Sequence, residues 1–347
     1  MALCGTEVPM FRSLLLLLPL ILLQACQPKP EMTRIEGRTM GTFYAVTLAD
    51  PFPGGERALQ SRVDALLLEI NREISTYDPD SVISRFNRAQ DTRPHPIPER
   101  MAKIVAQGIE AGERTRGQLD VTVGPLVNLW GFGPDKRPNK TPDQQAIAAA
   151  RERVGIDKLE LSRGSDGQPL LAKRRPDLYL DLSTLGEGAG SDAIATLLEQ
   201  AGVHNYLIEI AGAVRSQGHN PKGKPWRVAI VDPSDQPGAF QAVVTPKGMA
   251  VSTAGSYRNY YERDGVRYSH IIDPVTGHPI SHKLVSATVI LPSALEADAY
   301  DTALMVMGPE KAMAYARDHR LAAFLVIKTP QGFASRHTPE FDPYLAK

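Results

Sequence analysis

The chain has 347 residues, which is enough for one large domain or two ordinary ones. Lysine plus arginine and aspartate plus glutamate each number 39, so the formal net charge is zero. With 42% hydrophobic residues this is ordinary globular composition, and it offers no basic excess for nucleic-acid binding. An anionic ligand must therefore be held by local geometry, because the whole molecule provides no attractive field.

The N-terminus resembles a bacterial lipoprotein signal peptide. Arg12 precedes the apolar run SLLLLLPLILLQAC, which is short and interrupted by Pro19. The run ends in small residues before Cys26, so we expect residues 1–25 to be removed and Cys26 to carry the lipid. An ordinary secretory signal with an incidental cysteine is the alternative. The lipoprotein interpretation predicts a periplasm-facing protein on the inner or the outer membrane.

The remainder of the chain is expected to form one unit. Residues 26–34 are polar and would tether a single composite domain over residues 35–347, since no later segment has the composition of a linker. The chain has two cysteines, and Cys4 would leave with the signal peptide. The mature domain would then contain no free thiol, which excludes disulfides, cysteine metal sites and cysteine nucleophiles there.

The first half of the domain predicts a strand followed by helices. Residues Phe43–Leu48 alternate like a strand, with Gly41 at a bulge or a close approach of the backbone. Hydrophobic spacing, turn residues and caps predict helices over residues 57–75, after the turn at 78–80, over 99–116 and after the cap at 141–143. Asp120 lies between apparent strand residues, and Trp130 is expected in the core.

A glycine-rich segment follows a short predicted strand at Tyr179–Leu182. Gly186, Gly188 and Gly190 are expected in one loop before a helix at Ser191–Gln200. Backbone amides of such a loop can bind phosphate oxygens, assisted by the helix N-terminus. The spacing matches neither a P-loop nor a dinucleotide fingerprint, so the signal is weak alone.

The second half is rich in strands. Strands are expected in NYLIEIAGAVRSQG, in WRVAIVD, in a hairpin around residues 263–265, in VSATVILPS and in AAFLVIKTPQGF, which would close the sheet. Strands and helices are mixed without regular βαβ alternation. The chain is therefore predicted to have an α+β fold with mixed, mainly antiparallel sheets and flanking helices.

Two polar groupings suggest chemistry. In LEADAYDTAL, Asp298, Asp301 and Thr302 have the i, i+3, i+4 spacing of one helix face, and no cation stands beside them. A solvated helix face is the alternative. In SHIIDPVTGHPI, His270 at a strand end is a candidate general base beside Asp273, or else a histidine bonded to backbone.

Several motifs together resemble the ApbE family of FAD:protein FMN transferases. The resemblance runs from about Arg34 to Ala323 and is carried, in chain order, by Met40-Gly41-Thr42, STYDPDS, GQLDVTVGPLVNLWGFG, DLSTLGEGAGSD, IAGAVRSQG, VSTAGSYRNYY, YSHIIDPVTGHPI and ADAYDTALMVMG. It implies a T-fold-like core and a lipid-anchored enzyme.

The resemblance also implies site residues. Magnesium would be bound by Asp298, Asp301, Thr302 and the backbone carbonyl of Thr184, since hard oxygen ligands suit Mg²⁺. The residues implied to contact FAD are Met40, Tyr77, Gln118, Leu119, Asp120, Asp181, Glu187 and Ile272. Many relatives have lysine where Glu187 stands, so no lysine–phosphate pair is expected there.

The reaction implied by the resemblance moves FMN from FAD onto a threonine hydroxyl of an acceptor protein and releases AMP. His270 would accept the threonine proton, and Asp273 would orient it or the neighbouring turn. The implied acceptors are subunits of Nqr-type or Rnf-type membrane redox complexes. The alternatives are a Mg²⁺-dependent FAD pyrophosphatase and a non-catalytic flavin-binding lipoprotein.

Overall fold

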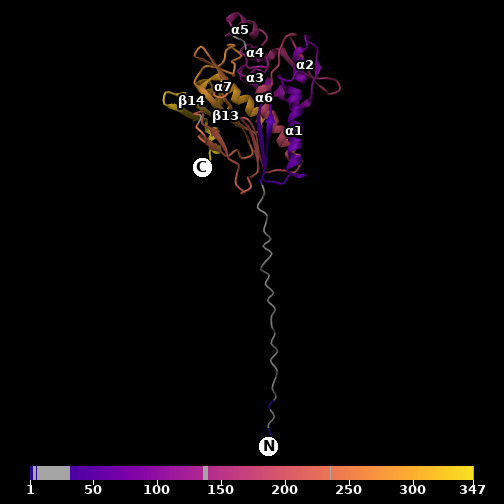
Figure 1. The fold of residues 1–347 in the computed structure, drawn as a ribbon, viewed down its shortest axis with the longest axis vertical. Coiled ribbons are helices and arrows are strands. Elements are labelled where there is room, and N and C mark those ends of the chain that lie inside the picture. Colours follow the sequence, from indigo (N-terminus) through magenta and orange to yellow (C-terminus); the bar gives the residue numbers. More distant parts are fainter. Residues whose placement is uncertain (3–4, 6–31, 136–139, 235, 347) are drawn as a thin grey trace.

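The computed structural model describes residues 1–2, 5, 32–135, 140–234 and 236–346 (Figure 1). Cys26 and nearly all of the predicted signal peptide lie outside the described residues, so lipidation and the signal stay predictions. Within the described ranges, no helix combines the length and apolar character needed to cross a bilayer.

An eight-stranded sheet forms the centre of the domain, and each neighbouring pair of its strands is antiparallel. In spatial order the strands are β1 (Thr33–Thr39), β2 (Thr42–Leu48), β6 (Tyr206–Ile210), β7 (Ala213–Gln217), β10 (Ala250–Gly255), β13 (Leu284–Leu291), β14 (Ala322–Thr329) and β15 (Gly332–His337). The predicted α+β class with mainly antiparallel pairing is confirmed. The segment AAFLVIKTPQGF supplies β14 and the first residues of the edge strand β15, so it lies at the end of the sheet, as predicted.

Three smaller sheets complete the strand content of the described residues. They are β3 (His95–Pro96) with β5 (Pro169–Lys173) and β4 (Leu159–Arg163), the hairpin of β8 (Val228–Val231) and β9 (Phe240–Val244), and the hairpin of β11 (Tyr260–Arg263) and β12 (Val266–Ser269). The last of these is the hairpin expected around residues 263–265.

The helices are distributed along the chain (Figure 1). They are α1 (Gly55–Ile74), α2 (Val82–Arg88), α3 (Glu99–Arg114), α4 (Gly124–Leu129), α5 (Gln144–Arg151), α6 (Ser183–Gln200), α7 (Ala294–Met307) and α8 (Pro309–Asp318), with short 3-10 turns η1 (Ile156–Lys158) and η2 (Pro339–Tyr344). Of these, α1, α6, α7 and α8 pack on strands of the large sheet. The predicted helices over 57–75, after 78–80, over 99–116 and after 141–143 correspond to α1, α2, α3 and α5.

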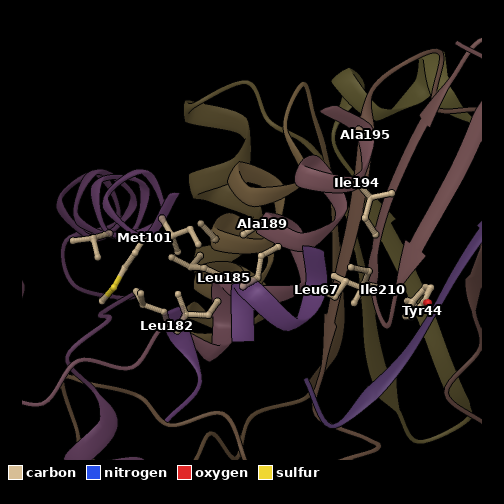
Figure 2. Close-up of a cluster of buried hydrophobic side chains, with 14 of the residues drawn as sticks. Tyr44, Leu67, Met101, Leu182, Leu185, Ala189, Ile194, Ala195 and Ile210 are labelled. Carbon is tan, nitrogen blue, oxygen red and sulfur yellow. The ribbon is translucent and has the colours of Figure 1, made fainter. Parts of the chain in front are cut away.

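The main core lies between the first strands of the sheet and helices α1 and α6. Figure 2 shows Leu67 of α1 and Ile194 of α6 beside Ile210 and Tyr44 of the sheet. A second apolar cluster joins β13 and β14 to α7 and α8. The opposite face of the sheet is covered by the β8–β9 hairpin and by η2, whose Phe341 is fully buried. Helices α6 and α7 are thus held between the sheet and α3.

Helix α6 begins eight residues earlier than the predicted helix, at Ser183 rather than Ser191. The glycines predicted to form a loop are inside the helix because they permit close packing. A Cβ at Gly188 would lie 2.4 Å from the backbone oxygen of Ala294 in α7, and a Cβ at Gly190 would lie 2.8 Å from Ile210. The missing side chains let α6 approach α7 and the sheet more closely than any other residue allows.

The predicted strand at Tyr179–Leu182 is not formed. Leu180 instead bonds through both its N–H and its carbonyl to the side-chain amide of Asn87, and the Asp181 N–H donates to the Val121 carbonyl at 2.7 Å. The segment is extended, but a side chain and one backbone bond replace the ladder of a sheet.

Two further local predictions are wrong. Asp120 is not flanked by strands, because its Oδ1 accepts the N–H of Thr122 at 2.8 Å in a tight turn before α4. Gly41 is not at a bulge but forms, with Met40, the two-residue turn between β1 and β2. Both residues have positive φ, 52° at Met40 and 74° at Gly41, as a hairpin turn of this length requires. Trp130 is buried, as predicted.

Candidate active site

Helix α7 carries Asp298 and Asp301 into the interior, where a third acid from α6 meets them. Both aspartates are buried, and the charge of Glu187 on α6 acts on each of them. The Glu187 carboxylate also accepts the N–H of Gly212 at 3.4 Å. The helix spacing in the sequence indicated the two aspartates, whereas only the fold brings Glu187 beside them.

The electrostatics of this acid cluster (Glu187, Asp298 and Asp301) oppose ionisation. Burial first, then the charges of Asp301 and Glu187, raise the pKa of Asp298 well above its usual value. Burial likewise raises the pKa of Asp301 well above its usual value, and the nearby hydroxyl of Ser252 on β10 opposes both shifts. Such crowding is costly unless protons or a cation offset the negative charge.

The residues at the acid cluster fit a hard divalent cation. The Asp301 Oδ2 is buried and makes no hydrogen bond, while its Oδ1 accepts the hydroxyl of Thr302 at 3.2 Å. Asp298 Oδ2 accepts the Gly188 N–H at 2.8 Å, and in a regular helix the partner of that N–H is the carbonyl of Thr184.

The candidate cation ligands include neutral oxygens as well as carboxylates. Among the described residues, no group of three or more histidine, cysteine, aspartate or glutamate side chains is arranged to hold a metal. Two carboxylates, a hydroxyl and a backbone carbonyl are an incomplete oxygen set, which suits Mg²⁺ because that ion retains water and accepts phosphate oxygens.

Met40 and Asp181 both lie against the start of α6. The Met40 sulfur is 3.3 Å from the position of a Cβ at Gly186, so the β1–β2 turn contacts the first turns of the helix. Asp181 Oδ1 accepts the N–H and the hydroxyl of Ser183, at 3.0 and 2.6 Å. The Asp181 N–H bonds to Val121, which directly follows Asp120. Met40, Asp120 and Asp181 therefore border the same helix end.

A second group of predicted residues is joined by Phe132. The hydroxyl of Tyr77 donates to the Phe132 carbonyl at 2.9 Å, and the Phe132 ring lies edge-on to His270 with 6.4 Å between ring centres. Phe132 also stacks on Tyr261 at 5.2 Å. The Tyr77 side chain is 64% exposed, and burial together with the charge of Asp181 raises its pKa. The shift places Tyr77 within electrostatic range of Asp181.

The hydrogen bonding of His270 defines its tautomer. Nδ1 lies 2.9 Å from the carbonyl oxygen of Asn259, which can only accept, so Nδ1 carries the proton and Nε2 has a free lone pair. Burial lowers the pKa of His270, which keeps the ring neutral near pH 7. The ring is thus prepared to accept a proton at Nε2.

Asp273 does not orient His270 in the structure. Its Oδ1 accepts the backbone N–H groups of Val275 and Thr276, and its Oδ2 accepts the Thr276 hydroxyl at 2.9 Å. The carboxylate is occupied by its own turn, so of the two predicted tasks the geometry supports only the second, holding the neighbouring turn.

The remaining predicted contacts are placed by backbone and core packing. Leu119 is buried and donates its N–H to the Thr115 hydroxyl, Gln118 donates its N–H to the Thr115 carbonyl, and Ile272 packs in a cluster with Trp130. Sequence reasoning missed Phe132, although it lies within a motif, because neither charge nor spacing distinguished it. It also missed Ser252, which lies in the quoted segment VSTAGSYRNYY but comes near the aspartates only because β10 packs on α7.

Comparison with known proteins identifies the family. The model of the ApbE family matches residues 40–325. The FAD:protein FMN transferase of Klebsiella pneumoniae is 51% identical over 318 residues, 92% of this chain and 91% of the relative. That of Escherichia coli is 45% identical over 343 residues, 96% and 97% of the two chains.

A solved structure agrees with these sequence matches. The flavin transferase ApbE from Vibrio cholerae superposes with a TM-score of 0.83 at 41% identity, covering 91% of this chain and 99% of that one. The match therefore includes the large sheet and the helices that carry the acid cluster. From its sequence and its fold, the chain belongs to the ApbE family.

Proposed function

We propose that the protein is a Mg²⁺-dependent enzyme that transfers FMN from FAD to a threonine hydroxyl of an acceptor protein and releases AMP. Its relatives from Klebsiella pneumoniae and Escherichia coli are named FAD:protein FMN transferase. The observation that carries the proposal is the acid cluster, in which the buried Asp301 Oδ2 has no hydrogen-bond partner. A cation and the phosphates it binds would satisfy this oxygen and offset the crowded charge.

The reaction is a substitution at phosphorus. The threonine oxygen forms a bond to the FMN phosphorus, the bond from that phosphorus to the bridging oxygen breaks, and AMP leaves with the bonding electrons. The proton of the threonine hydroxyl passes to Nε2 of His270, which is the unprotonated ring nitrogen. When bound, Mg²⁺ supplies charge neutralisation at the phosphate oxygens.

The chain itself binds and orients the reactants. Asp298, Asp301, Thr302 and the Thr184 carbonyl would hold the cation, and Asp298 is fixed by the Gly188 N–H. Tyr77, Asp181 and the other predicted contacts would hold the flavin nucleotide; the residues assigned to this task are Met40, Gln118, Leu119, Asp120, Glu187 and Ile272. The raised pKa of Glu187, caused by burial, favours its neutral form near phosphate.

The proposed setting is the periplasmic side of a bacterial membrane. A lipid on Cys26 would anchor the domain, and the proposed acceptors are subunits of Nqr-type or Rnf-type redox complexes. The support for this setting is the N-terminal sequence and the family resemblance.

The test follows covalent flavin fluorescence on an acceptor subunit in a denaturing gel. Purified protein, FAD and acceptor should give a fluorescent acceptor band with Mg²⁺ and none with a chelator. AMP release without a fluorescent band would support the FAD pyrophosphatase alternative. FAD binding without AMP release would support the carrier alternative.

A further inference from the structure

Asn87, near the end of α2, pairs with the backbone of a single residue 93 positions later in the chain. Its Nδ2 donates to the Leu180 carbonyl at 2.8 Å, and its Oδ1 accepts the Leu180 N–H at 2.8 Å. In an extended chain both groups of one residue point toward the same edge. The amide therefore occupies the place where a neighbouring strand would pair.

The register of this segment decides where Asp181 points. Leu178, Leu180 and Leu182 are fully buried in the main core, so the residues between them are directed the other way. Asp181 then bonds to Ser183 in the first turn of α6. Fixing Leu180 thus fixes Asp181 and, through it, the start of α6.

The other end of α2 holds the loop that carries Tyr77. The hydroxyl of Ser81 donates to the Ser75 carbonyl at 2.7 Å, and that of Ser84 reaches the same oxygen at 3.3 Å. The charge of Asp181 also contributes, after burial, to the raised pKa of Tyr77. Helix α2 therefore links the loop that carries Tyr77 to the segment that carries Asp181.

Helix α2 is itself anchored away from the flavin contacts. Buried Lys173 donates from Nζ to the Asn87 carbonyl at 3.2 Å and to the Ala89 carbonyl at 2.7 Å, at the C-terminal end of the helix. The same ammonium lies 4.8 Å from the ring centre of Phe86. The Asn87 side chain consequently extends from a fixed base.

We propose that Asn87 is a positioning residue for flavin binding, which sets the spacing between the Tyr77 loop and the Asp181 segment by pairing with Leu180. The inference rests on the proposed function, because Tyr77 and Asp181 contact flavin only if FAD is the substrate. Without the amide, the buried N–H and carbonyl of Leu180 lose their partners and the segment moves to satisfy them. The acid cluster on α7 keeps its own contacts.

The experiment compares Asn87→Ala and Asn87→Asp with the parent, using the full chain with Mg²⁺. The dissociation constant for FAD is measured by calorimetry, and kcat and KM by AMP release. Both variants should raise the FAD dissociation constant and KM about tenfold, while kcat changes less than about twofold. Asn87→Asp keeps the volume of the side chain but replaces the Nδ2 donor by an oxygen that repels the Leu180 carbonyl.

Asn205→Ala is the matched control. The Asn205 amide also joins distant segments, donating to Asp50 Oδ1 at 2.8 Å and accepting the His219 N–H at 2.9 Å. It lies at the start of β6, whereas Gly212, which contacts Glu187, follows the other end of that strand. This variant should lower Tm and leave FAD affinity unchanged.

Two results would overturn the inference. In one, the Asn87 variants lose thermal stability as Asn205→Ala does but bind FAD like the parent. In the other, Asn87→Asp binds FAD normally while Asn87→Ala does not, which would assign the effect to volume instead of hydrogen bonding. A parent that binds FAD but neither releases AMP nor labels an acceptor contradicts the proposed function alone, and the binding comparison still decides the role of Asn87.

Discussion

Asp298 places its carboxyl in a buried position beside two further acids, and a folded protein tolerates such crowding only when protons or a cation offset the charge. Asp298→Asn keeps the size of the side chain and removes one charge. Mg²⁺ affinity should fall, and FMN transfer should drop about 10²–10³-fold through lost electrostatic stabilisation. The Tm of the metal-free protein should equal or exceed that of the parent, measured by thermal denaturation in chelator.

The control for this variant is Asp318→Asn, at the exposed C-terminal end of α8. It removes the same charge from a position outside the acid cluster and should leave transfer unchanged. Parental transfer rates of Asp298→Asn at limiting Mg²⁺ would return the α7 carboxyls to a structural role.

The protonation of His270 should determine the acid limb of the pH profile of kcat. Burial lowers its pKa below the usual 6.5, so the neutral ring persists as the pH falls, and kcat should decline only below pH 6.5. His270→Gln should reduce kcat about 10²–10⁴-fold and remove this limb. His278→Gln, in the turn beside Trp130 at 5.6 Å between ring centres, should retain it. An unchanged limb in His270→Gln would reject His270 as the base.

At the residue scale, the sequence predicts groups of side chains that local chain geometry alone brings together. Asp298, Asp301 and Thr302 could be grouped because helix geometry places i, i+3 and i+4 on one face. The approach of Glu187 depends on how α6 packs on α7, which local spacing does not encode. Asn87 was overlooked for the same reason, since its partner Leu180 is 93 residues away.

At the element scale, the contact between α6 and α7 is the feature that builds the acid cluster. Asp192 of α6 accepts the N–H groups of Ala294 and Leu295, each at 3.0 Å, and the Ser293 hydroxyl at 2.7 Å. One helix thus caps the other. This cap and the glycine contacts of α6 together fix the rotation of α7, and with it the direction of its acids.

Gly188→Ala tests this contact. The new Cβ would lie 2.4 Å from the Ala294 oxygen, so the helices must separate, and the protein should lose about 1–3 kcal/mol of unfolding free energy together with Mg²⁺ affinity. Chemical denaturation measures the unfolding free energy, and calorimetry measures the Mg²⁺ affinity. Gly186→Ala is the matched control, because its nearest neighbour is the flexible Met40 sulfur at 3.3 Å, and stability should stay within about 1 kcal/mol. Equal stability of the two variants would contradict the packing argument.

Elements with strong periodicity were predictable, and those defined by tertiary contacts were not. The spacing of α1 and the alternation of β2 follow directly from burial on one face. The start of α6 was misplaced because glycine normally breaks helices, and here the close approach of α7 outweighs that propensity. The alternation of residues Tyr179–Leu182 predicts a strand because the segment is extended, although its pairing partner is a side chain.

At the scale of the whole molecule, we expect the predicted anchor and the catalytic domain to be separable. Cys26→Ser should leave FAD turnover and acceptor labelling unchanged and shift the protein from the membrane to the soluble fraction, because no thiol takes part in the proposed chemistry. Cell fractionation measures the location of the protein, and the transfer assay on each fraction measures FAD turnover and acceptor labelling. Cys4→Ser should change neither, since that residue would leave with the signal peptide. Loss of turnover in a folded, exported Cys26→Ser protein would contradict the separation.

If Cys26 carries the proposed lipid, strand β1 would act as a spacer between the membrane and the candidate active site. It begins at Thr33, inside the predicted tether of residues 26–34, and its far end leads into Met40 beside α6. Seven residues of strand span about 20–24 Å, and the six residues from 27 to 32 extend at most about 20 Å. A lipid on Cys26 would therefore limit the reach of the enzyme to roughly 45 Å above the bilayer surface. Under the proposed anchoring, acceptor threonines within that height would be accessible to the enzyme, and those held farther out would not.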